Sequence, residues 1–247
     1  MSIKHPRDLE GLTAIGRIVG RVLAHLSQLV RPGVSTDELD RVCEQMLNAE
    51  NARATPRNVY RYPRHLMVSI NDEAVHGLPG ARVVKPGDLV SLDLTADRDG
   101  YVADAAVTVV VDGANATRRK LAACAQAAFE HGLAEARPGV SVRRIGRAVE
   151  AEVERQGFSV IRELTGHGVG RTIHEAPTVP NFDDPSANTI LTDGLVLTIE
   201  PIICAGAGRV YTAADQWTLK TFDRSPAAHF EHTIVVREEG PLILTAA

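Results

Sequence analysis

The sequence lacks the features that mark membrane proteins and secreted, disulfide-rich proteins. No apolar run approaches the roughly 18–20 residues that cross a bilayer, and the start, MSIKHPRDLEGL, lacks the continuous apolar stretch of a signal peptide. Three cysteines, Cys43, Cys124 and Cys204, are too few and too scattered for a disulfide framework or a CxxC metal site. We therefore expect a cytoplasmic protein with reduced thiols and no membrane partner.

The sequence also lacks an excess of basic over acidic residues, and it lacks recognisable linker segments. The formal net charge is -4, which argues against broad electrostatic binding to nucleic acid. Apolar residues make up 44% and charged residues 23%, which suits a globular protein with a sizeable core. Because no Gly/Ser-rich or charged linker divides the 247 residues, we expect a single domain over 1–247.

One five-residue segment, RPGVS, occurs at 31–35 and again at 137–141. Before the first copy, apolar residues spaced i, i+3 and i+4 over 9–30 predict a helix that the Pro-Gly pair ends. Ser35 then has Glu38 three positions later, which is the capping pattern that opens a second helix. The segment therefore predicts the junction within a pair of helices.

The second half of the chain repeats this order. Helices are predicted over 114–135 and 142–156. The run 85–94 resembles the run 191–200, and each is a turn that leads into an alternating strand. Helix pairs mixed with strands, without strict βαβ alternation, favour an α+β fold with a largely antiparallel sheet. We expect two halves, about 1–113 and 114–247, related by a pseudo-twofold axis.

The predicted strands of each half also contain two carboxylate residues. Asp93 and Glu200 lie in the two matched strands. The next strand of the first half carries Asp104, and the last strand of the second half carries Glu231. An ionised carboxylate inside a sheet costs several kcal/mol unless it is paired or metal-bound. For any one of the four alone, a solvent-facing residue or a salt-bridge partner is the simpler interpretation.

A fifth candidate ligand is His167, in the segment GHGVGRTIHEAP at 166–177. The glycines beside it would let backbone and a ligand approach closely, although a surface loop is the plain alternative. Two Asp, two Glu and one His form an oxygen-rich set that suits Mn²⁺, Fe²⁺, Co²⁺ or Zn²⁺. Since five ligands exceed the needs of one catalytic ion, the set predicts two divalent metal ions that share a water molecule.

At these residues the chain resembles the type I methionine aminopeptidases of the pita-bread fold, over essentially its whole length. The motifs, in the family's order, are HGLP, Asp93 with Asp104 eleven residues later, GHGVGR, TIEP and EHT. The resemblance implies a metallopeptidase that removes the N-terminal methionine from peptides and nascent proteins. A metal-bridged water would attack the first peptide bond.

The resemblance also implies roles for individual residues. Five residues would hold the two metal ions: Asp93, Asp104, His167, Glu200 and Glu231. Among them, Asp104 and Glu231 would bridge both ions, and Glu200 would also shuttle a proton. His76 would lie near the substrate amine and scissile nitrogen, and His174 near the substrate carbonyl. From local sequence alone, His76 is interpreted as a turn residue and His174 as a core side chain.

The pocket for the first residue departs from the better-known bacterial pattern. Positions at which many relatives have Cys, Tyr, Cys and Phe are here Pro56, Val59, Met67 and Ile173. Tyr62 and Trp217 match the family's aromatic wall. We expect an apolar pocket lined by Tyr62, Met67, Ile173 and Trp217. An aminopeptidase with an altered first-residue specificity is therefore an alternative.

Two further alternatives share the fold. Proline-specific aminopeptidases carry a large extra N-terminal domain, for which this chain has no room. Metal-free pita-bread proteins that bind peptides have typically lost the ligand residues, all of which are present here. We expect a monomer whose partners are peptide and nascent-protein N-termini, without direct nucleic-acid binding. Transient association with the ribosome is left open.

Overall fold

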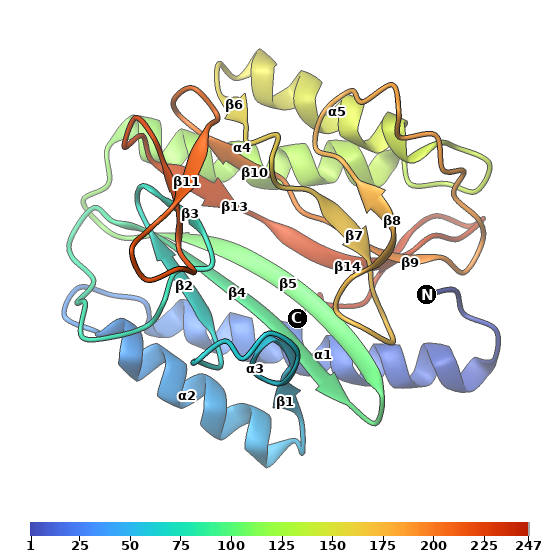
Figure 1. Cartoon of the computed structure of the whole chain (residues 1–247), viewed down its shortest axis with the longest axis horizontal. Helices are drawn as coiled ribbons and strands as arrows, with labels where there is room; N and C mark the ends of the chain where they lie inside the picture. Colours follow the sequence, from blue (N-terminus) through green and yellow to red (C-terminus); the bar gives the residue numbers. More distant parts are fainter. Residues whose placement is uncertain (247) are drawn as a thin grey trace.

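A computed structural model describes residues 1–246 of the chain, and the four longer helices within it form two pairs (Figure 1). The helices are α1 (Pro6–Leu29), α2 (Thr36–Ala49), α3 (Thr55–Val59), α4 (Ala116–Ala134) and α5 (Val142–Arg155). The α1/α2 pair and the α4/α5 pair lie on opposite sides of the view, with the sheet between them. The four helices predicted from the sequence are therefore confirmed. Within residues 1–246, none of the helices has the length and apolar character needed to span a bilayer.

The main sheet has nine strands in antiparallel pairing, in the order β1-β4-β5-β14-β9-β7-β8, with β2 paired to β4 and β15 to β14. Two smaller sheets have the orders β13-β10-β6 and β11-β12-β3. The first-half strands are β1 (Arg53–Ala54), β2 (Met67–Ile70), β3 (Glu73–Val75), β4 (Leu89–Arg98) and β5 (Tyr101–Val110). The second-half strands are β6 (Ser159–Val160), β7 (Gly166–Gly168), β8 (Glu175–Val179), β9 (Val196–Ile199), β10 (Ile202–Cys204), β11 (Val210–Thr212), β12 (Leu219–Thr221), β13 (Ala227–His229), β14 (Glu231–Val235) and β15 (Leu242–Ile243). The α+β class and the antiparallel sheet are as predicted.

Each helix pair packs on its own part of the sheet. Leu26 of α1 and Leu39 of α2 belong to a buried apolar cluster that includes Leu92 of β4. A second cluster joins Phe129 of α4 to Leu197 of β9. The sheet is continuous between the two clusters because β5 pairs with β14. The two halves thus have separate apolar cores under one shared sheet.

The repeated RPGVS segment makes the same contacts in both halves. Gly33 and Gly139 have positive φ angles of 96° and 81°, a backbone conformation that favours glycine. The Gly33 N–H donates to the Val84 carbonyl at 3.0 Å, and the Gly139 N–H donates to the Leu191 carbonyl at 2.9 Å. The duplication in the sequence is therefore also a duplication of structure.

The last residue of each repeat is the N-cap of a helix. The Ser35 hydroxyl accepts a hydrogen bond from the Glu38 N–H at 3.1 Å. The Ser141 hydroxyl accepts from the Arg143 N–H at 3.2 Å. These bonds satisfy N–H groups that the first turn of a helix leaves unpaired, so they fix where α2 and α5 begin.

The strands lie where the sequence predicts them, and one continues beyond its predicted end. A turn opens the run 85–94, as predicted, because the Asp88 carboxylate accepts from the Lys85 N–H at 2.8 Å. Strand β4 begins after that turn and continues past the predicted run to Arg98. Strand β5 carries Asp104, also as predicted. Alternation of apolar residues locates a strand but does not define its ends.

Ser35→Ala and Ser141→Ala should each lower the free energy of unfolding by about 0.5–2 kcal/mol, because each removes a helix N-cap. The loss should be larger for Ser141→Ala, since the Ser141 hydroxyl also donates to the Ala187 carbonyl at 2.8 Å. Urea denaturation measures the difference, with Ser35→Thr and Ser141→Thr as controls that keep the hydroxyl. Equal losses in the two alanine variants would contradict the assignment.

Candidate metal centre

One cavity of about 770 Å³ brings the predicted functional residues together. Its lining includes all five candidate ligands, both candidate catalytic histidines and the four expected pocket side chains. The ligands come from β4, β5, β7, β14 and the residue that follows β9. Both halves of the chain therefore contribute to the same cavity.

Three of the carboxylates lie on adjacent strands at one level of the sheet. Asp93 of β4 and Glu231 of β14 are each directly opposite Ala106 of β5. Asp104 precedes Ala106 by two residues in β5, so its side chain projects from the same face. The three carboxylates therefore share the face of the sheet that lines the cavity.

Glu200 and His167 are positioned by one threonine. The Thr198 hydroxyl donates to Glu200 Oε1 at 3.0 Å and accepts from the His167 N–H at 3.1 Å. Close backbone approach beside His167 explains the neighbouring glycine, because a Cβ on Gly168 would collide with the Ala176 carbonyl oxygen. The interpretation of these glycines from the sequence agrees with this packing.

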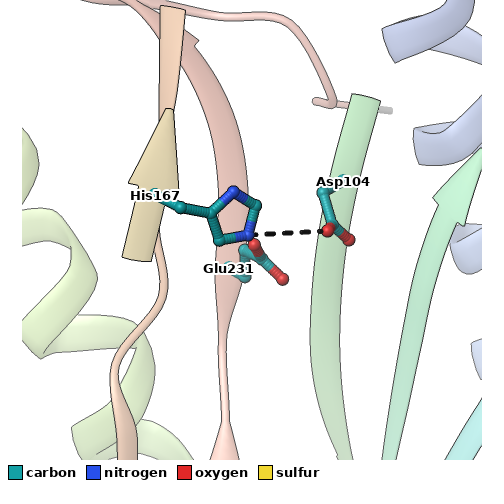
Figure 2. A group of neighbouring side chains, drawn as sticks. All are labelled: Asp104, His167 and Glu231. Carbon is teal, nitrogen blue, oxygen red and sulfur yellow. Dashed lines mark ion pairs between the residues drawn. The ribbon is translucent and has the colours of Figure 1, made fainter. Parts of the chain in front are cut away.

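The imidazole of His167 points toward Asp104 and Glu231, as Figure 2 shows. One ligand atom from each of these three residues lies within 4.8 Å of the other two. His167 Nε2 lies 3.9 Å from Asp104 Oδ2 and 3.4 Å from Glu200 Oε1. These separations exceed hydrogen-bond length, and they suit donor atoms that surround a shared cation.

Burial changes the protonation of these groups. It raises the pKa of Asp93, Glu200 and Glu231 well above the ordinary range, with a further contribution from neighbouring carboxylates. Burial also raises the pKa of Asp104 to about 6. It lowers the pKa of His167, so that the imidazole is neutral and offers a lone pair. The cluster thus combines carboxyl groups whose charged forms repel one another with a neutral nitrogen donor.

This donor set fits divalent cations. Within residues 1–246, no hydrogen-bond donor reaches the buried oxygens Asp104 Oδ1 and Glu231 Oε1. Unpaired buried oxygens are costly, and a cation would both satisfy them and offset the repulsion between carboxylates. Oxygen-rich sites with one imidazole suit first-row divalent metals.

The two remaining histidines face the same cavity. His76 follows β3 with a left-handed φ of 59°, a conformation that is uncommon outside glycine and often found at functional sites. Burial lowers the pKa of His76 to about 4. Burial lowers the pKa of His174, and the neighbouring His167 lowers it further by a smaller amount. The His167 and His174 rings contact each other with centroids 4.2 Å apart, so His174 lies directly beside the candidate ligands.

The four expected pocket side chains line the same cavity as the carboxylates. Tyr62 and Trp217 pack edge to face with centroids 5.2 Å apart. Met67 of β2 is directly opposite Asp93 of β4, so it lies next to a candidate ligand. Ile173 also lines the cavity. Residues opposite each other in the sheet therefore connect the pocket to the metal centre.

The structure distinguishes between the positions at which the sequence departs from the bacterial pocket. Pro56 lines the cavity together with Met67 and Ile173. Val59 is 53% exposed and is not among the lining residues. The end of α3 turns Val59 outward, so its change from Tyr does not alter the cavity wall directly.

Tyr60 and His229 also line the cavity close to candidate site residues, although the sequence did not single them out. The Tyr60 hydroxyl lies 2.6 Å from His174 Nδ1. His229 Nε2 lies 3.5 Å from Glu231 Oε2. Because His229 precedes Glu231 by two residues, strand alternation could have indicated it. Tyr60 and His174 are 114 residues apart, and no local pattern connects them.

Residues 10–238 match the model of metallopeptidase family M24, and the chain belongs to this family. Its relatives include methionine aminopeptidase 2 of Bacillus subtilis, which is 40% identical over 247 residues, 99% of each chain. The methionine aminopeptidase of Escherichia coli is also 40% identical, over 99% of this chain and 94% of that protein. The crystal structure of a methionine aminopeptidase from Thermotoga maritima superposes with a TM-score of 0.97 at 34% identity, and all of both chains is covered. The pita-bread fold is thereby confirmed.

In chelator-treated protein, the stabilising contribution of Asp104 should be lost as the pH rises through about 6. Burial raises the folded-state pKa of Asp104 from 3.8 to about 6, so this contribution is full below pH 3.8 and is lost as the pH passes 6. Buried histidines with lowered pKa values, such as His76, act in the opposite direction, so the effect is the difference in stability between the wild type and Asp104→Asn. Saturating Mn²⁺ should remove this loss, because cations bind ionised carboxylates.

Urea denaturation at several pH values between roughly 4.5 and 7.5, with and without Mn²⁺, measures this effect across the window set by the ordinary and raised carboxyl pKa values. Asp104→Asn is the matched variant, because an amide does not titrate. Relative to this variant, the wild type should lose stability in chelator over the same range. A difference that instead grows in favour of the wild type from about pH 5 to 7 without cations would contradict the prediction.

Proposed function

We propose that this chain is a metal-dependent methionine aminopeptidase that hydrolyses the first peptide bond of peptides and new proteins. The observation that carries the proposal is the convergence of four carboxylates and one imidazole beside an apolar pocket in a single cavity. Relatives named methionine aminopeptidases, similar over nearly the whole chain, support it.

We further propose that the cavity binds two divalent ions, Co²⁺, Mn²⁺, Fe²⁺ or Zn²⁺. Their ligands would be Asp93, Asp104, His167, Glu200 and Glu231. The central positions of Asp104 and Glu231, each with an unpaired oxygen, support a bridging role for both. When bound, such ions act as Lewis acids and lower the pKa of a water molecule. Since both halves supply ligands, residues 1–247 would act as a single catalytic domain.

The chain's own groups move and stabilise charge during hydrolysis. Glu200 takes a proton from the attacking water and passes it toward the leaving amine, a double role that a positioned carboxylate can perform. His174 donates a hydrogen bond to the substrate carbonyl oxygen as negative charge develops on it. His76 contacts the substrate amine and the scissile nitrogen. Its low pKa supports a neutral imidazole there.

The apolar wall selects the first side chain. Tyr62, Met67, Ile173 and Trp217 provide contacts for an unbranched apolar chain such as that of methionine. A charged first residue would lose its hydration there without gaining a partner. Met67 is flexible, so the pocket can adapt to side chains of similar length, and a broader first-residue specificity is the alternative to a strict one.

The other expectations from the sequence remain predictions. They are a cytoplasmic location, a monomeric state, transient ribosome association and the absence of direct nucleic-acid binding. A proline-specific enzyme is disfavoured because the methionine aminopeptidase relatives match this chain over nearly their full length. A non-catalytic peptide-binding protein is disfavoured because every candidate ligand is present and lines the cavity.

Asp104→Asn should lower metal content and activity together, because a neutral amide replaces a carboxylate at the centre of the cluster. Metal analysis and cleavage of a Met-Ala-Ser peptide, with chelator-treated protein titrated with Mn²⁺, Fe²⁺, Co²⁺ and Zn²⁺, measure both quantities. Asp99→Asn is the control, since its carboxylate is 87% exposed at the end of the β4–β5 hairpin. Unchanged metal content and turnover in Asp104→Asn would refute the ligand assignment.

His174→Ala should keep its metal ions but slow turnover, because the loss of one oxyanion donor typically lowers kcat by about 10²–10³. Steady-state kinetics on the same peptide, together with metal analysis, separate the two effects. Loss of metal would instead make His174 a ligand. An unchanged kcat would leave it with a packing role only.

Met67→Ala should broaden the first-residue preference without changing metal content, because Met67 lines the wall but is not a candidate ligand. Wild-type protein should prefer methionine and norleucine, with weaker cleavage of norvaline and leucine, since one methylene changes specificity by about 1–3 kcal/mol. Peptides that differ only in their first residue test both statements. Cleavage of N-terminal Lys, Glu or Pro as fast as Met would contradict the pocket assignment.

A further inference from the structure

Tyr60 makes a contact with His174 that connects the two halves of the chain at the cavity. Tyr60 follows the last residue of α3, and His174 lies between β7 and β8. The Tyr60 hydroxyl is 2.6 Å from His174 Nδ1, and both side chains line the cavity. The two rings are tilted by 42° with centroids 5.8 Å apart, so the contact is made through the hydroxyl rather than by stacking.

We propose that Tyr60 is a positioning residue for the reaction: its hydroxyl donates to Nδ1 of His174 and thereby keeps the imidazole proton on Nε2. The inference rests on the proposed function, in which His174 donates a hydrogen bond to the substrate carbonyl oxygen. A neutral imidazole carries one N–H, and the partner of one ring nitrogen determines which nitrogen has the proton. With Nδ1 bound to Tyr60, Nε2 is the nitrogen left to donate to substrate.

The direction of this hydrogen bond follows from the acidity of its two partners. A phenol O–H is a stronger acid than the N–H of a neutral imidazole, so O–H···N is the more stable arrangement. The opposite arrangement would place the proton on Nδ1 and leave Nε2 able only to accept. His174 could then donate no hydrogen bond from Nε2 to a carbonyl oxygen. Tyr60 therefore selects the tautomer that the reaction needs.

The surroundings of His174 make this contact important for the orientation of its ring. The neighbouring His167 ring packs against one side, with centroids 4.2 Å apart. The Thr172 hydroxyl donates to the His174 carbonyl oxygen at 3.0 Å, which fixes the backbone. Neither contact distinguishes between the two ring nitrogens. The Tyr60 hydroxyl does distinguish between them, because it lies at Nδ1.

Tyr60→Phe tests the proposal, because it keeps the ring and removes only the hydroxyl. We expect kcat for a Met-Ala-Ser peptide to fall by about threefold to tenfold, the effect of one neutral hydrogen bond. KM and metal content should stay unchanged. In the His174→Ala background the same substitution should have no further effect, since the two residues act through one hydrogen bond.

Tyr211→Phe is the matched control, because Tyr211 is an exposed tyrosine of β11 that is not among the cavity-lining residues. It should leave kcat and KM as in the wild type. An equal fall in kcat for Tyr60→Phe with and without His174 would overturn the proposal. An unchanged kcat in Tyr60→Phe would also overturn it.

A spectroscopic measurement tests the same hydrogen bond without using activity. In Zn²⁺-loaded protein labelled with ¹⁵N-histidine, the His174 resonances, assigned with His174→Ala, should show an unprotonated Nδ1 and a protonated Nε2. Tyr60→Phe should shift them toward a mixture of tautomers. A protonated Nδ1 in the wild type would overturn the proposal. If the wild-type protein cleaves no methionyl peptide, the proposed function fails, whereas this measurement still decides whether Tyr60 sets the tautomer.

Discussion

Four carboxylates share one buried cavity, and much of the structure around it holds them there despite their mutual repulsion. Threonine hydroxyls hold some of these residues by hydrogen bonds. The Thr95 hydroxyl donates to Asp104 Oδ2 at 2.8 Å, and Thr198 donates to Glu200. Thr233 both donates to the Asp104 carbonyl oxygen and accepts from its N–H. These neutral donors fix the carboxylates without cancelling the charge that attracts cations.

The segment that carries His167 and His174 is also held by the first half of the chain. Arg171, between the two histidines, donates to Asp8 at 2.7 Å, and Tyr101 donates to the same carboxylate at 3.0 Å. The Arg171 guanidinium lies 3.9 Å from the centre of the Tyr101 ring, so charge and stacking act together. The second-half histidines therefore depend on α1 and β5 for their placement.

Local patterns in the sequence predicted the parts of the fold that local chemistry determines. Ser35 and Ser141 marked the beginnings of α2 and α5 because a cap acts within three residues. The turn before β4 was predicted because its hydrogen bond is local, but the continuation of β4 to Arg98 was not predicted. Tyr60 was missed because its partner comes from the other half. The five candidate ligands were found through a combination of residue types and motif order that no single position provides.

Part of the proposed substrate wall lies outside the strands that carry the carboxylates, although Met67 of β2 is directly opposite Asp93. Asp93, Asp104 and Glu231 lie on hydrogen-bonded strands in fixed register. Trp217 lies in the β11–β12 turn, and Ile173 lies between β7 and β8. Substitutions in these connecting segments can therefore change the proposed wall without altering the strands that carry the carboxylates. Descendants of this chain can acquire new substrate preferences without passing through an ancestor that has lost its metal-binding residues.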